Sequence, residues 1–173
     1  SKIYKKYIEK GYINARVDYN VDVDSSTNKA IININISEGE RVIVGSVVVD
    51  GAKAFKTKKI IKKMKNRPKK VFSQEELKKD LNEIESFYKN NGYAGFKIID
   101  STFSFREGKY VDIDIKLEEG GRYVFGDTVF SGNSVYNTSE LLTAIEYQKG
   151  KVFKDEKLND TIRNIQEKYA DKG

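Results

Sequence analysis

The chain has 173 residues, of which 38% are hydrophobic and 34% charged, and this composition is typical of a folded protein rather than a disordered one. It contains neither cysteine nor histidine, which excludes disulfides, thiol nucleophiles, zinc sites built from these residues and catalysis by an imidazole base. Its formal net charge of +6 suits an anionic partner, but does not distinguish nucleic acid, lipid headgroups and acidic protein.

The sequence repeats itself with a period of 81 residues, and the repeat needs no gap. The shift superposes apolar and glycine positions, for example Gly51 on Gly132, and Tyr7 on Tyr88 and Tyr169. A repeat of this kind defines the structural unit. We therefore expect the C-terminal half of one unit at residues 1–39, a complete unit at 40–120 and the N-terminal half of a following unit at 121–173.

The first 39 residues predict the end of a helix followed by a hairpin. Ile3 and Tyr7 lie at helical spacing before Gly11. Apolar residues then alternate with polar ones in two runs, which are Val17, Tyr19, Val21 and Val23, and Ile32, Ile34 and Ile36. Strict alternation is the pattern of strands with one apolar face.

The complete unit opens with a β-branched strand over residues 41–50. Thr57 is expected to cap a first helix, and the sequence Ser73-Gln-Glu-Glu76 predicts a capping box at the start of a second helix that ends at Gly92. The two helices are expected to bury Ile60, Ile61 and Met64, and Leu77, Leu81, Ile84 and Tyr88, respectively.

A hairpin closes the unit, with strands over residues 96–105 and 111–117. The early apolar residues of its first strand are out of phase with Phe103 and Phe105, which predicts a β-bulge between Ile98 and Ser101. The first and third strands of the unit can pair in parallel, which leaves the second strand as a free edge. The predicted fold class is α+β, with tandem β-α-α-β-β units that each place two helices on one face of a three-stranded mixed sheet.

The last 53 residues repeat the first half of the unit. They predict a strand over residues 122–130, a helix capped by Thr138 and a second helix whose stripe includes Tyr169. Almost no linker separates consecutive units. We therefore expect stiff joints with a hinge at the glycines between them, namely Gly39, Gly120 and Gly121.

Four short motifs recur at fixed places in the unit: Ser131-Gly-Asn133 after the first strand, Lys149-Gly-Lys-Val-Phe153 before the second helix, Tyr88-Lys-Asn-Asn-Gly-Tyr93 after it, and Glu118-Glu-Gly120 at the end. With the β-α-α-β-β order, this pattern resembles the POTRA domain of the Omp85 family of outer-membrane assembly barrels. The resemblance covers the whole chain. The complete unit departs from the pattern in one turn, where Asp50-Gly-Ala-Lys53 replaces the Gly-Asn motif.

The resemblance implies a BamA-like scaffold on the periplasmic side of the outer membrane, in a parent chain that continues into a membrane β-barrel. Its implied partners are unfolded outer-membrane proteins, bound by β-augmentation on the second strand, and accessory assembly lipoproteins. The expected peptide-binding edge consists of Phe96, Lys97, Ile98, Ile99, Asp100, Ser101, Thr102 and Phe103. We expect no cofactor and no metal site.

Ten basic residues crowd residues 53–70, and they include Lys58, Lys59, Lys62, Lys63, Arg67, Lys69 and Lys70. They fit a solvated helix face around the buried residues of the first helix. They also fit a docking surface for an acidic partner or for an anionic membrane surface. The matching residues 137–151 carry only two basic residues, so the fold itself does not need this charge.

Two other function classes fit the sequence less well. A KH-type RNA-binding module also begins β-α-α-β-β, but it needs a Gly-x-x-Gly loop between its helices. The loops here read Asn66-Arg-Pro-Lys-Lys70 and Tyr147-Gln-Lys-Gly-Lys151, so we expect no nucleic-acid partner. An enzyme lacks support, because no nucleophile–base pair or phosphate-binding loop is present. Asp112 and Asp114 are expected to solubilise a strand face.

Overall fold

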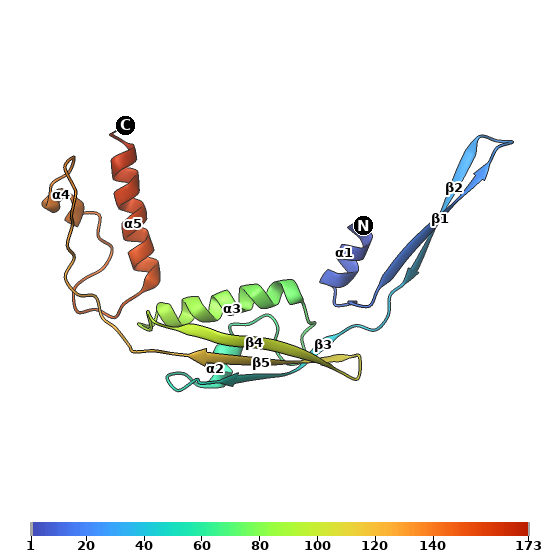
Figure 1. The fold of residues 1–173 in the computed structure, drawn as a ribbon, viewed down its shortest axis with the longest axis horizontal. Coiled ribbons are helices and arrows are strands. Elements are labelled where there is room, and N and C mark those ends of the chain that lie inside the picture. The colour runs from blue at the N-terminus through green and yellow to red at the C-terminus, as the bar shows by residue number, and fades with distance from the viewer. Residues whose placement is uncertain (1, 173) are drawn as a thin grey trace.

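A computed structural model describes residues 2–172, which form an elongated row of elements (Figure 1). One end holds α1 (Lys2–Glu9), β1 (Arg16–Asp24) and β2 (Lys29–Ser37). The centre holds β3 (Ile43–Asp50), α2 (Thr57–Ile61), α3 (Gln74–Lys89), β4 (Lys97–Arg106) and β5 (Tyr110–Glu118). The other end holds α4 (Thr138–Leu142) and α5 (Asp155–Ala170). Over residues 2–172, no helix has both the length and the apolar character needed to cross a membrane.

The central sheet has the predicted mixed topology. Its strand order is β3-β5-β4, with β3 parallel and β4 antiparallel to β5. The β4 register shifts between Ile98 and Asp100, which confirms the predicted bulge. β4 therefore lies at one edge of the sheet.

Both central helices cover the same face of this sheet. Val111, Ile113, Ile115 and Leu117 of β5 are buried in one cluster with Ile60 and Met64 around α2 and with Leu77, Ile84 and Tyr88 of α3. In β3 a register shift between Val44 and Ser46 resets the alternation, so that Val42 and Val44, and then Val47 and Val49, all face the core. The predicted α+β fold class is confirmed.

The hairpin of β1 and β2 places the two predicted apolar runs on one face. Val17, Tyr19 and Val21 lie opposite Ile36, Ile34 and Ile32. The apolar face of this hairpin is open, since Tyr19 is 75% and Ile32 63% exposed.

The strand expected over residues 122–130 is wrong. Only an isolated bridge between Val124 and Val152 forms there. One side of this segment does have main-chain partners, because Phe125 donates to the Lys151 carbonyl at 2.9 Å and accepts from the Gly150 amide at 2.8 Å. In the complete unit Val44 makes the same two bonds, with Lys70 and Lys69. In the complete unit β5 pairs with the other side, and the described residues after 121 contain no counterpart of β5. A strand needs a ladder partner for its main-chain groups, which this segment has on one side alone.

The expected helix caps were partly wrong. Thr57 and Thr138 are the first helical residues, and the N-cap positions belong to Lys56 and Asn137. Asn137 forms a reciprocal capping box with Glu140, at 2.9 and 3.0 Å. Ser73 does cap α3 by accepting from the Glu76 amide at 3.3 Å, but the Glu76 carboxylate pairs with lysines instead.

Candidate functional site

The outer edge of β4 is the main unpaired edge of the central sheet. β4 pairs with β5 on one side, and within residues 2–172 no main-chain partner lies on its other side. The opposite edge of the sheet is partly covered, because Lys69 donates to the Val44 carbonyl at 2.8 Å and Phe72 to the Val42 carbonyl at 3.1 Å. β4 is thus the more accessible template for an added strand.

The bulge divides the β4 edge into two stretches. Beside it, the Ser101 amide donates to the side chain of its neighbour Asp100 at 2.8 Å. The Arg106 carbonyl faces the hairpin, where it accepts from Lys109 at 3.3 Å. Because main-chain groups alternate in direction along a strand, the free groups beyond the bulge belong to Phe103 and Phe105. The regular part of the edge is therefore the C-terminal half of β4.

An aromatic cluster borders this regular stretch. The rings of Phe72 and Phe103 lie 5.0 Å apart, and those of Phe103 and Phe105 lie 5.9 Å apart. Phe72 is buried, whereas Phe105 is 51% exposed. Phe105 thus offers an apolar contact beside free main-chain groups.

The residues expected at the edge fall into three groups. Phe96 precedes β4, and its ring is buried against Tyr88 with centroids 4.2 Å apart, so hydrophobic packing removes it from the edge. Residues 97–100 lie before or within the bulge. Ser101, Thr102 and Phe103 lie on β4 beyond it, and the expected set omitted Phe105.

The basic residues form a second exposed feature around α2, which we call the lysine-rich surface. All of its members are exposed, and they are Lys58, Lys59, Lys62, Lys63, Arg67, Lys69 and Lys70. The Lys59 ammonium lies 4.8 Å from the Phe55 ring centroid, and that of Lys63 lies 5.1 Å from the Phe87 centroid. Cation–π contacts of this kind hold the ammonium groups over the surface.

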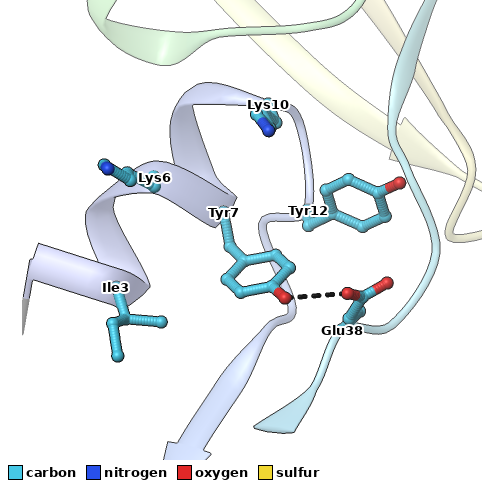
Figure 2. A pocket seen from close by; sticks show the side chains of 6 residues that line it. All are labelled: Ile3, Lys6, Tyr7, Lys10, Tyr12 and Glu38. Carbon is cyan, nitrogen blue, oxygen red and sulfur yellow. Dashed lines mark hydrogen bonds between the residues drawn. The ribbon is translucent and has the colours of Figure 1, made fainter.

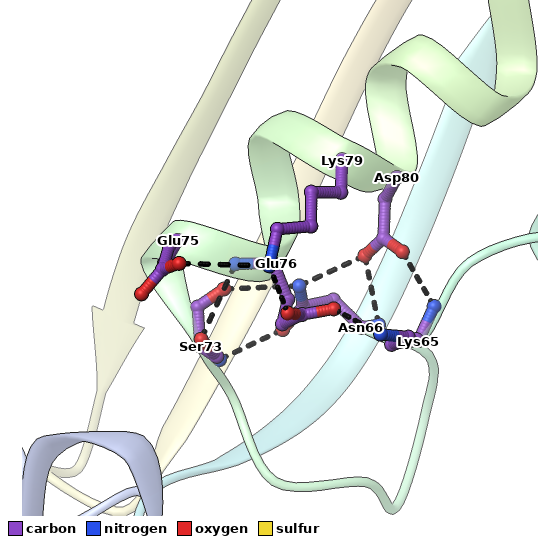
Figure 3. Close-up of polar contacts among 7 residues, drawn as sticks. All are labelled: Lys65, Asn66, Ser73, Glu75, Glu76, Lys79 and Asp80. Carbon is purple, nitrogen blue, oxygen red and sulfur yellow. Dashed lines mark hydrogen bonds and ion pairs between the residues drawn. The ribbon is translucent and has the colours of Figure 1, made fainter.

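A buried polar network holds the loop that carries this surface (Figure 3). The Asp80 carboxylate accepts from the Lys65 amide at 2.6 Å and from the main-chain and side-chain N–H groups of Asn66 at 2.9 and 2.8 Å. Asn66 in turn accepts from the Ser73 amide at 2.8 Å. The pKa of Glu76 is lowered by its hydrogen bonds with Lys65 and Lys79. In the following unit Thr161 takes the place of Asp80 and accepts from the Glu146 amide at 2.9 Å.

The joints between units consist of repeated contacts. At the first joint Val42 donates to the Gly11 carbonyl at 2.9 Å, and the Arg41 guanidinium donates to the Lys10 carbonyl at 3.1 Å. At the second, Tyr123 and Arg122 make the same bonds to Gly92 and Asn91, at 2.7 and 3.2 Å.

The glycine at each joint leaves no room for a side chain. Gly11 and Gly92 have φ of +89° and +100°. A Cβ on Gly11 would lie 2.3 Å from the Val71 side chain, and one on Gly92 would lie 3.0 Å from that of Val152. Through these contacts the C-terminal ends of α1 and α3 pack directly against the unit that follows each of them.

The glycines expected to act as hinges lie beside these contacts. Gly39 and Gly120 have φ of +71° and +68°, which favours glycine, whereas Gly121 has no such requirement. The preceding glutamates also recur: Tyr7 donates to Glu38 at 2.8 Å and Tyr88 to Glu119 at 2.9 Å. Burial, together with the Glu119 carboxylate, raises the pKa of Tyr88. Hinge motion at these glycines stays a prediction.

A hollow of about 350 Å³ lies beside Tyr7, Tyr12 and Glu38 (Figure 2). In the complete unit Phe55 fills the corresponding place, 5.2 Å from the Tyr88 ring and 5.8 Å from that of Tyr93. We therefore interpret the hollow as the place of a packing contact rather than as a ligand site.

The two joints differ in one polar contact. At the second joint the Asn90 side chain accepts from the Glu156 amide in the first turn of α5, at 2.9 Å. At the first joint the equivalent positions are Glu9 and Glu75, which line one shallow hollow. Only the second joint therefore has this cap from the preceding unit.

The sequence model of the POTRA family, described as "Surface antigen variable number repeat", matches residues 42–120 and 123–173. The chain belongs to the POTRA family. This assignment decides between the POTRA and KH interpretations of the β-α-α-β-β order.

Similar proteins agree with the POTRA assignment. The chain is 23% identical to the outer membrane protein assembly factor BamA of Neisseria meningitidis over 98% of its length, and 26% identical to that of Buchnera aphidicola over 82%. It spans only 22% and 24% of these relatives. The POTRA3-5 crystal structure of Haemophilus influenzae BamA matches with a TM-score of 0.59 and 18% identity, over 96% of this chain and 66% of that one.

Sequence reasoning missed the contacts that join the POTRA units. The spacing indicates that Gly11 and Gly92 are repeated helix ends, but it does not indicate that they contact the next unit. The signal was present, since Arg41 and Arg122 follow the linker glycines at the same spacing. Partners separated by 31 residues cannot, however, be assigned from periodicity alone.

Proposed function

We propose that this chain is part of a periplasmic interaction scaffold of an outer-membrane protein assembly factor. In this proposal, β4 receives extended segments of unfolded outer-membrane proteins by main-chain pairing. The observation that carries the proposal is the free regular edge of β4, with Phe103 and Phe105 directing main-chain groups outward. The names of the two BamA relatives support the assembly role.

The geometry favours weak and transient pairing. The bulge and the Asp100 side chain leave only a short regular stretch for an added strand. Main-chain hydrogen bonds supply affinity with little sequence preference, and Phe105 adds a contact for one apolar side chain. A scaffold that passes its clients onward needs such weak binding.

The chain acts in this proposal as a scaffold on the periplasmic side of the outer membrane and not as an enzyme. Accessory assembly lipoproteins dock on surfaces that the client leaves free. The repeated joint contacts of Gly11 and Gly92 support this role, because they set the relative placement of successive units.

Edge pairing is tested with pairs of N-methylated peptides. An extended peptide with alternating apolar residues is titrated into the labelled chain, and amide shifts are recorded. Two versions carry N-methyl groups on odd or on even residues, so that each blocks only one edge of the peptide. We expect shifts over residues 102–106 with the parent peptide and with one methylated version, and none with the other. Equal binding of both methylated versions would refute main-chain pairing.

A matched pair of substitutions locates the site. Phe105 is 51% and Ile99 52% exposed, and both lie on β4. Phe105→Ala should weaken peptide binding several-fold, because it removes the apolar contact beside the regular edge. Ile99→Ala, within the bulge, should leave binding unchanged. The opposite ranking would place the client on the other side of the bulge.

A further inference from the structure

The lysine-rich surface is the strongest feature that client pairing does not use. We propose that it binds an anionic lipid membrane through headgroup phosphates. This inference is independent of the β4 edge, because it concerns α2 and the loop that follows it.

The first argument is uncompensated charge. Residues 53–70 contain ten cations. Among these ten, within the described part of the chain, Lys65 alone forms an ion pair, with Glu76 at 2.5 Å. The nearby carboxylate of Asp80 is buried and accepts three N–H groups. The other nine cations of this segment have no ion pair in the described part of the chain, so their mutual repulsion is only weakly offset, and an anionic surface relieves it.

The second argument is rigid presentation. Ile60 and Met64 are buried and anchor α2 and the turn after it. Asn66 is fixed through Asp80, and Lys69 and Lys70 are held against β3 by main-chain bonds at 2.8 and 2.7 Å. The backbone under the charges is thus already ordered, so binding does not have to order it.

The third argument concerns the kind of anion. Protein interfaces are enriched in aromatic residues and arginine at their centre and depleted in lysine. The lysine-rich surface has a single arginine, and no residue from 53 to 70 is a large exposed apolar side chain. Lysine acts as a mobile point charge, which suits the diffuse phosphate layer of a membrane better than a fixed acidic protein.

Nucleic acid fits less well. Single strands bind to proteins by stacking bases on exposed aromatic rings. Here Phe55 is half-buried, with its ring 4.7 Å from that of Phe87 and beneath Lys59. The ring is therefore not free to stack on a base.

The surface is also specific to one unit. In the following unit the matching segment has Lys149 and Lys151, and Lys149 pairs with Asp127. Since α4 forms in the following unit without these cations, a helix at this place does not require the charge found around α2.

Vesicle flotation of the whole chain tests the proposal, with vesicles of phosphatidylcholine alone or with about 30% phosphatidylglycerol at about 0.15 M salt. The surface variant carries Lys58, Lys62, Lys69 and Lys70 changed to Gln, which spares the cation–π lysines. The control variant carries four exposed lysines outside the surface changed to Gln, namely Lys5, Lys29, Lys97 and Lys116. Both variants have the same net charge, and circular dichroism checks that both fold.

We expect the parent and the control variant to bind only the anionic vesicles. The surface variant should lose about fivefold in partitioning for each of the four lysines, or about 600-fold in all. Equal losses in the two variants would show that net charge alone acts and would overturn the proposal. Absence of vesicle binding by the parent, or tighter binding to single-stranded RNA or to a polyglutamate peptide than to anionic vesicles, would overturn it as well.

Discussion

Replacing Gly92 with alanine should disturb the second joint, whereas the same replacement at Gly108 should not. Both glycines have positive φ, +100° and +66°. A Cβ on Gly92 would lie 2.9 Å from the Arg122 side chain and 3.1 Å from the Tyr123 carbonyl oxygen, both in the following unit. A Cβ on Gly108 would meet nothing within 4 Å. The two variants thus share backbone strain and differ in contact across the joint.

The expected losses of unfolding free energy follow from the backbone strain and from the contact across the joint. Left-handed backbone costs a non-glycine residue about 1–2 kcal/mol, which is the whole expected loss of unfolding free energy for Gly108→Ala. At Gly92 the new Cβ also pushes Tyr123 away and weakens its 2.7 Å bond to the Gly92 carbonyl. A lost hydrogen bond adds about 0.5–1.5 kcal/mol, so Gly92→Ala should lose about 1.5–3.5 kcal/mol.

Spin-label distances measure the joint directly. The chain has no cysteine, so Glu83→Cys on α3 and Gln166→Cys on α5 introduce a unique exposed pair. Electron–electron double resonance should give a shifted or broader distance distribution for Gly92→Ala. Gly108→Ala should match the parent. Identical distributions for both variants would refute the role of Gly92 as a joint contact.

Three further predictions test the core and one turn. Asp80→Asn should cost about 2–4 kcal/mol in urea unfolding, because an amide cannot accept all three N–H groups that the buried carboxylate accepts. Ile113→Asp should abolish the circular dichroism of the folded unit, since it buries an unpaired charge, whereas Val48→Asp, at a site 53% exposed, should leave it intact. The hydroxyl of Ser26, with neighbouring groups, lowers the pKa of Asp24 from 3.8 to about 2. Because the folded pKa is the lower one, this stabilisation should be present above about pH 4 and lost as the pH falls towards 2, and a carboxyl titration by NMR that finds an ordinary midpoint would contradict it.

The sequence alone determined the repeat, the fold class and the free second strand. These features depend on local spacing, because apolar residues two apart mark a strand and those three or four apart mark a helix. Even the β4 bulge was predictable, since Phe103 and Phe105 are out of phase with Phe96 and Ile98. The lysine-rich surface was visible as composition, but whether its charges are neutralised was not.

Only the tertiary structure decided which main-chain groups find partners. Residues 122–130 have the composition of a strand, but the described chain pairs them on one side only. Phe96 reads as an edge residue, but it stacks on Tyr88, and Phe105 instead lies at the regular edge. Gly92 reads as a helix end, but it also contacts the next unit. Each outcome depends on residues that are distant in sequence and adjacent in space, so local periodicity carries no information about it.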